Sequence, residues 1–133
     1  MDEIGIARAL QFPIHPEMIW EVDSFFMMQR VSEEGPETDR PYHPRILLAV
    51  SHDEGIIVGA EISMPWNYQE QTGFDFLKLI TKLEFRPSVV LVKREELFHI
   101  LQHLASELEI NLDGVRAIPA VEAVRSHMAN ITP

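Results

Sequence analysis

The apolar residues of the chain follow two periods, and the period changes along the sequence. From Met18 to Met28, tryptophan, valine and phenylalanine recur at alternate positions, which is typical of a β-strand. Both sets of alternate positions contain apolar residues, so we expect this strand to be covered on both faces. The preceding residues 1–17 contain Pro13 and Pro16 and show no such period, and we predict that they are irregular.

Two further strands are expected in the middle of the chain. The stretches 45–52 and 56–64 are rich in apolar and β-branched residues. Residues 53–55 separate them, and a connection of this length that ends in Gly55 is typical of a β-hairpin with a left-handed glycine. Residues 32–44 hold three prolines and four acidic residues without a periodic apolar set, which predicts an exposed loop.

The second half of the chain alternates between helical and extended patterns. Apolar residues spaced three and four apart predict helices, and a short continuous apolar run predicts a buried strand. In the clearest helix Leu97, Leu101 and Leu104 fall on one stripe, so we predict that Leu101 lies in the core. The predicted elements are a helix over 74–83, a strand over 88–93, a helix over 95–108, a strand within 110–118 and a helix that begins at Pro119.

The order of these elements predicts a fold class. Three antiparallel strands followed by alternating helices and strands indicate a single α/β domain over residues 1–133, with a five-stranded mixed sheet flanked by helices. We expect the strand that contains Trp20 to lie centrally and to run parallel to the strand over 88–93. The order βββαβαβα is that of the ribonuclease H-like fold.

Two parts of the chain resemble known families. Residues 20–23 (WEVD) resemble the W-x-V-D sequence that opens integrase and transposase cores. The last third of the chain resembles an uncharacterised bacterial domain family of unknown function through residues 86–92 (RPSVVLV), 108–112 (LEINL) and 118–121 (IPAV). Glu109 stands where the pattern of that family usually has glycine. These motifs consist mainly of core and turn residues, so the second resemblance implies a fold and not a chemistry.

The integrase resemblance implies a candidate metal site. Those enzymes use an aspartate of the first strand as a metal ligand, a role that falls on Asp23 here. Their chemistry needs three or four carboxylates that converge on two metal ions, and Asp75 and Glu122 are the other candidates for a Mg²⁺ site. The fourth predicted strand, however, ends in Lys93 and Arg94 where these enzymes place an aspartate. A cation at that position opposes metal binding.

We therefore prefer a non-catalytic binding or protein-interaction module on a degenerate ribonuclease H-like scaffold, without a cofactor. The alternative is a divalent-metal-dependent nuclease or phosphotransfer enzyme that uses Asp23, Asp75 and Glu122 with Mg²⁺. For the binding module, Trp66 and Tyr68 are the candidate binding residues, because aromatic side chains in a strand-to-helix loop are suited to a partner surface. The expected partner is another protein or a fused domain.

Composition and net charge exclude several classes of partner and site. The formal net charge is −10, so the surface repels phosphate backbones and non-specific nucleic-acid binding is disfavoured. The chain contains no cysteine, which excludes disulfides, cysteine-ligated zinc and a cysteine nucleophile. It shows no apolar run near the ~20 residues of a membrane span and no signal-peptide core, so we predict a cytoplasmic protein without membrane contact.

Two histidines have a spacing that zinc-binding helices use. His99 and His103 lie four residues apart on the predicted helix over 95–108, so both project from one side of it. The order H-E-x-x-H is absent, and the leucine stripe leaves both imidazoles on the solvated face. We therefore predict that this pair holds no tight metal site.

Overall fold

The computed structural model describes residues 3–27 and 42–131, with side chains up to residue 128. The loop predicted over 32–44 lies outside these residues except for its last three. No helix of the described ranges is long and apolar enough to cross a membrane. In chain order the elements are α1 (Glu3–Ala9), β1 (Ile14–Phe26), β2 (Arg45–Ser51), β3 (Ile57–Ser63), α2 (Tyr68–Leu83), β4 (Arg86–Val92), α3 (Glu95–Glu107), β5 (Asn111–Gly114) and α4 (Pro119–Ile131).

The five strands form one mixed sheet in the order β3-β2-β1-β4-β5. Strand β1 is central, antiparallel to β2 and parallel to β4, with Trp20 opposite Ser51 on one side and Val90 on the other. Strand β3 pairs antiparallel with β2, and β5 pairs parallel with β4. The predicted five-stranded mixed sheet and its ribonuclease H-like order are confirmed.

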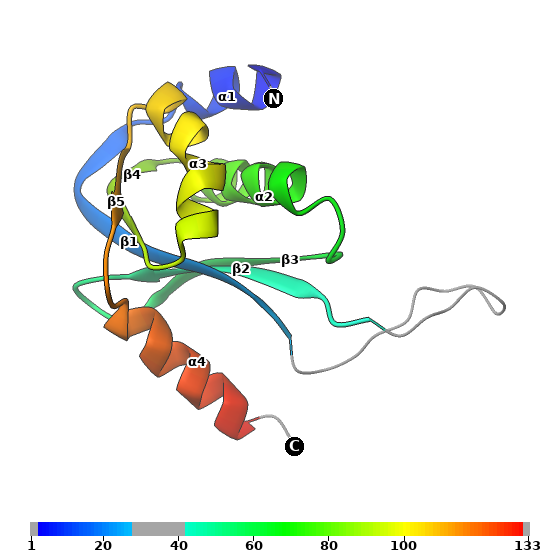
Figure 1. Ribbon diagram of the computed structural model, residues 1–133. Coiled ribbons are helices and arrows are strands. Elements are labelled where there is room, and N and C mark those ends of the chain that lie inside the picture. The colour runs from blue at the N-terminus through cyan, green and yellow to red at the C-terminus, as the bar shows by residue number, and fades with distance from the viewer. Residues whose placement is uncertain (1–2, 28–41, 132–133) are drawn as a thin grey trace, which may run out of the picture.

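Helices cover both faces of the sheet, with α1, α2 and α3 on one face and α4 on the other (Figure 1). The alternation along β1 assigns its side chains to these two layers. Trp20 and Val22 are fully buried against α2 and α3. The residues between and after them, Glu21 and Asp23, consequently point to the face that α4 covers.

The leucine stripe of α3 packs as its spacing predicts. Leu97, Leu101 and Leu104 are buried in the core that includes Trp20 and Phe76. The prediction that Leu101 lies in the core is therefore confirmed.

The prediction that residues 1–17 are irregular is wrong. They contain α1, and β1 begins at Ile14. Proline is tolerated here because the register between β1 and β4 shifts between His15 and Ile19, on either side of Pro16. The pairing of β1 with β2 begins only at Trp20, so Pro16 interrupts neither ladder.

Helix α2 begins at Tyr68 and not at Phe74 as predicted. Its first turns contain only polar residues, an aromatic residue and Gly73, so the apolar period starts after the helix does. The residue before it, Asn67, has a φ of 58°, a left-handed conformation that asparagine tolerates and that turns the chain into the helix.

Two further residues adopt left-handed backbone where the sequence pattern indicates glycine. Gly55 has a φ of 69° in the β2–β3 hairpin, as predicted. Glu109 has a φ of 60° directly after α3 and its C-cap residue. Glycine adopts this conformation without steric cost, and the resemblance noted in the sequence leads us to expect glycine at this position.

Candidate functional site

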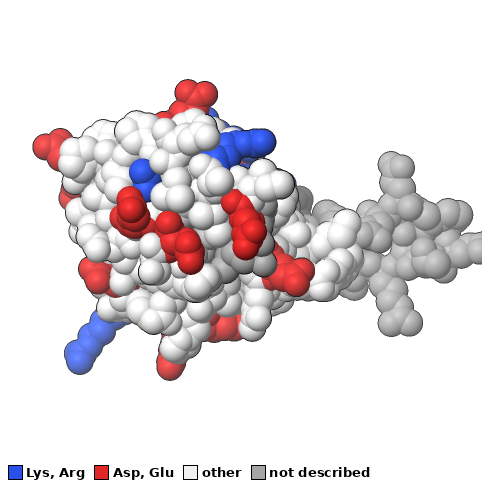
Figure 2. Space-filling view, turned by 90° about the horizontal axis from the view of Figure 1, so that it is seen from above, with Lys and Arg blue, Asp and Glu red and all other residues white. Residues whose placement is uncertain are grey.

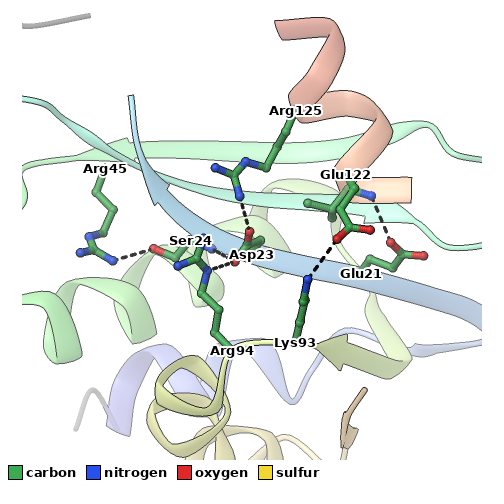
Figure 3. Close-up of polar contacts among 9 residues, drawn as sticks. Glu21, Asp23, Ser24, Arg45, Lys93, Arg94, Glu122 and Arg125 are labelled. Atoms are coloured by element: carbon green, nitrogen blue, oxygen red, sulfur yellow. Dashed lines mark hydrogen bonds and ion pairs between the residues drawn. The ribbon is translucent and has the colours of Figure 1, made fainter. Parts of the chain in front are cut away.

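Asp23 is the centre of a polar cluster between β1, α4 and the β4–α3 junction (Figure 3). Its side chain is 4% exposed. Oδ1 accepts a hydrogen bond from Arg94 Nε at 2.7 Å, and Oδ2 accepts one from Arg125 Nη1 at 3.1 Å. The backbone N–H of Ser24 also donates to Oδ1, at 2.9 Å. Both carboxylate oxygens are therefore engaged by guanidinium groups.

The two arginines reach Asp23 from different elements. Arg94 is the N-cap residue of α3, and only Lys93 separates it from the end of β4. Arg125 projects from α4, and its guanidinium carbon also lies 4.0 Å from the centre of the Phe25 ring. The aspartate thus ties the central strand to the helices on both faces of the sheet.

A second ion pair flanks this cluster. Lys93 Nζ lies 3.2 Å from Glu122 Oε1, and both side chains are about half exposed. Glu122 and Arg125 both lie on α4, and their side chains project toward the same part of the sheet (Figure 3). Its carboxylate is directed to a lysine.

Glu21 positions α4 on the sheet, a role that the sequence analysis did not predict. Its side chain is fully buried, and Oε1 accepts a hydrogen bond from the backbone N–H of Val121 at 3.0 Å. Its other oxygen lies 2.5 Å from Nδ1 of His52. Since Val121 belongs to the first turn of α4, this contact satisfies a backbone donor that the helix itself leaves free. A glutamate within a strand covered on both faces was the available signal.

Replacing Glu21 by leucine is expected to lower the free energy of unfolding by about 1–3 kcal/mol, because the N–H of Val121 loses its acceptor in a buried place. Urea denaturation measures this loss. Glu21→Gln is the matched control, since an amide oxygen still accepts from Val121 and the amide N–H₂ reaches His52. Equal stability of the two variants would show that the carboxylate does not anchor α4.

The three carboxylates considered for a metal site do not come together. Asp75 lies on α2, on the opposite face of the sheet from Asp23, where it is buried and accepts a hydrogen bond from Gln71 Nε2 at 2.9 Å. Glu122 lies on the same face as Asp23 but pairs with Lys93. Asp75 is separated from the others because α2 covers the face of the sheet opposite α4, and local sequence spacing does not encode which face a helix covers.

These residues do not fit a two-metal centre. Such a centre needs several carboxylates around the ions, whereas Asp23 is surrounded by guanidinium groups. Among the described residues, no group of three or more histidine, aspartate or glutamate side chains is arranged to hold a metal ion.

The two predicted binding residues have different environments. Trp66 is 47% exposed, and its ring lies edge-on to Tyr42 at 5.2 Å between centroids. The Tyr68 ring instead lies under the guanidinium of Arg45, 3.7 Å from its centroid. Arg45 also lies over the ring of Phe26, at 4.4 Å. Trp66 is therefore half exposed, whereas Tyr68 packs against the guanidinium of Arg45.

His99 and His103 each pair with a carboxylate one helical turn away. His99 Nε2 lies 3.5 Å from Glu95 Oε1, and His103 Nε2 lies 3.6 Å from Glu107 Oε1. Both imidazoles are exposed. Exposed pairs of this kind contribute little to stability, and the absence of a tight zinc site here stays a prediction.

The strand order and the helices on both faces define a ribonuclease H-like fold of the kind found in retroviral integrase catalytic cores. The HTLV-2 integrase catalytic core domain in complex with magnesium, in its trimeric form, superposes with a TM-score of 0.60 at 16% identity, over 87% of this chain and 69% of that chain. The BIV integrase catalytic core domain gives a TM-score of 0.57 at 17% identity, over 86% of this chain and 65% of that chain. At these identities the similarity concerns the fold.

The chain belongs to the family described as Domain of unknown function (DUF6930), which matches residues 6–129. The predicted resemblances to an uncharacterised domain family and to integrase cores are thereby confirmed. The chain also resembles the simian T-cell lymphotropic virus intasome in complex with PP2A regulatory subunit B56 gamma. The TM-score is 0.60 at 16% identity, over 87% of this chain and 40% of that chain. No curated protein matches it.

Proposed function

We propose that this protein is a non-catalytic binding module, which contacts another protein or a fused domain and uses a degenerate ribonuclease H-like scaffold. The observation that carries the proposal is the pairing of both Asp23 oxygens with Arg94 and Arg125. In this arrangement the first-strand aspartate holds the fold together and has no oxygen free of a cationic partner.

The charge of the cluster supports the proposal. Asp23 contributes one negative charge, and Arg94 and Arg125 contribute one positive charge each, so these three groups together carry +1, although the chain as a whole carries −10. Positive charge at this place repels divalent cations. Mg²⁺ binds oxygen ligands, and both oxygens of Asp23 are already paired with guanidinium groups.

The aromatic surface near the ends of β1 and β3 supports a binding role. Trp66 and Phe26 are each about half exposed, as is Met64 beside them in the strand-to-helix loop. Large apolar side chains of this kind are enriched at the centres of protein interfaces. We assign Trp66 to direct contact with the partner protein and Tyr68 to the support of Arg45. The cytoplasmic location stays a prediction.

The alternative function, a metal-dependent nuclease that uses Asp23, Asp75 and Glu122, rests on the likeness to a magnesium-bound integrase core. A nuclease assay distinguishes the two functions. We expect the purified protein to cleave neither duplex DNA nor duplex RNA with Mg²⁺ or Mn²⁺, because among the described residues no carboxylates converge to offset the repulsion between two metal ions.

The assay compares the wild type with Asp23→Asn on fluorescently labelled duplexes. For a binding module neither protein cleaves above the buffer control, and Asp23→Asn changes only the stability. Asp75→Asn serves as the second comparison, because it removes a carboxylate from the opposite face. Metal-dependent cleavage by the wild type that disappears in Asp23→Asn would reverse the order of the two functions.

A further inference from the structure

A groove runs between α2 and α3 on the face of the sheet opposite Asp23. Its volume is about 700 Å³, within the range of ligand-binding clefts. Leu77 and Leu104 form a buried apolar floor, and Phe74 and Ile100 contribute to its walls. Phe74 is 48% exposed, and Nζ of Lys78 lies 5.2 Å from the centre of its ring.

Gly73 lines the groove, and none of its contacts with the described residues requires glycine at this position. A Cβ added to Gly73 would come no closer than 3.8 Å to Leu104 Cδ2, which is an ordinary contact distance. The residue lies inside α2, where glycine lowers helix stability relative to alanine. Its effect is therefore to leave space between the two helices.

The charged side chains on the lining of the groove are acidic. Glu70 in the first turn of α2 and Glu96 in the first turn of α3 both line it and are exposed. Figure 2, which views the side of α1, α2 and α3, shows several acidic side chains on this face, together with fewer basic ones. Among the described residues that line the groove there is no lysine or arginine.

We propose that this groove binds a basic amphipathic helix of a partner protein. Such a helix presents apolar side chains at spacings of three and four residues, which fit a floor and walls made by two helices. Lysine or arginine residues beside the apolar stripe would lie against Glu70 and Glu96. The proposal deepens the binding function proposed above, because it names a second surface and the chemical class of the ligand.

The probe is a fluorescein-labelled peptide of leucine and lysine, about 14 residues long, patterned as an amphipathic helix. Fluorescence anisotropy against the wild type is expected to show saturable binding. Gly73→Leu is expected to weaken this binding at least tenfold, because its side chain fills the groove. Since this substitution leaves the charge unchanged, it separates groove binding from a general attraction between lysine and an acidic protein.

Further variants test the walls and the rim. Phe74→Ala, which truncates an exposed ring, is expected to weaken binding several-fold without unfolding the protein. Glu96→Gln is expected to weaken binding and to reduce its salt dependence. Its matched control is Glu107→Gln on the same helix, whose carboxylate does not line the groove, and this control is expected to bind as the wild type does. Gly73→Ala is expected to raise the midpoint of thermal unfolding by about 2–5 °C.

The proposal is overturned if folded Gly73→Leu and Phe74→Ala bind the peptide as tightly as the wild type. Equal binding of a scrambled leucine–lysine peptide, or of a leucine–glutamate peptide with the same pattern, also overturns it. The proposal is also overturned if the wild type shows no saturable binding of the peptide. These outcomes are independent of the nuclease assay, so failure of the groove and failure of the non-catalytic function can be distinguished.

Discussion

Exchanging both arginines for carboxylates, in the double variant Arg94→Asp and Arg125→Glu, is expected to lower the free energy of unfolding by about 3–5 kcal/mol in the absence of metal. Asp23 then loses both of its cationic partners while its own side chain stays buried. An uncompensated buried charge has a cost of this order. The added carboxylates also repel Asp23, which increases the loss.

The same variant is expected to gain stability from Mn²⁺, because it presents three carboxylates near one another. Urea denaturation with EDTA and then with increasing Mn²⁺ measures both effects, and a metal concentration 100 times the dissociation constant would restore about 2.7 kcal/mol. A control with methionine at both positions, Arg94→Met and Arg125→Met, removes the cations without adding ligands. A wild type that gains as much stability from Mn²⁺ would contradict the role assigned to the arginines.

The second large effect is expected in the core. Leu101→Ala should lower the free energy of unfolding by about 2–5 kcal/mol, because the leucine is only 1% exposed and its removal leaves a cavity between α3 and the sheet. Urea denaturation measures the loss. Gln102→Ala, at the neighbouring exposed position, should change stability by less than ~0.5 kcal/mol. A loss below ~1 kcal/mol in Leu101→Ala would mean that α3 contributes little to the core.

Periodicity predicted the sheet because period-two and helical patterns are local properties of the sequence. It does not predict the elements within residues 1–17, because prolines generally interrupt helices and strands, whereas Pro16 lies where the strand register shifts. The start of α2 was missed because its first turns carry few apolar residues.

The sequence likewise predicted one part of the candidate site and not the other. The conflict between Asp23 and the cations after the fourth strand was predicted, because the integrase resemblance places an aspartate where this chain has Lys93 and Arg94. Arg125 and Glu21 were not predicted, because their contacts depend on where α4 crosses the sheet. That crossing is fixed by apolar contacts such as those of Ile118 and Val121 with β2, which local spacing does not encode.

The central position of β1 has a consequence for the synthesis of the protein. Strands β1, β2 and β3 leave the ribosome before β4 and can pair antiparallel with one another before it emerges. The other edge of β1 stays open until β4 emerges, since Trp20 pairs with Val90 much later in the chain. A nascent chain that stops before β4 therefore exposes an unpaired strand edge and one apolar face around Trp20, which are features that promote aggregation and chaperone binding.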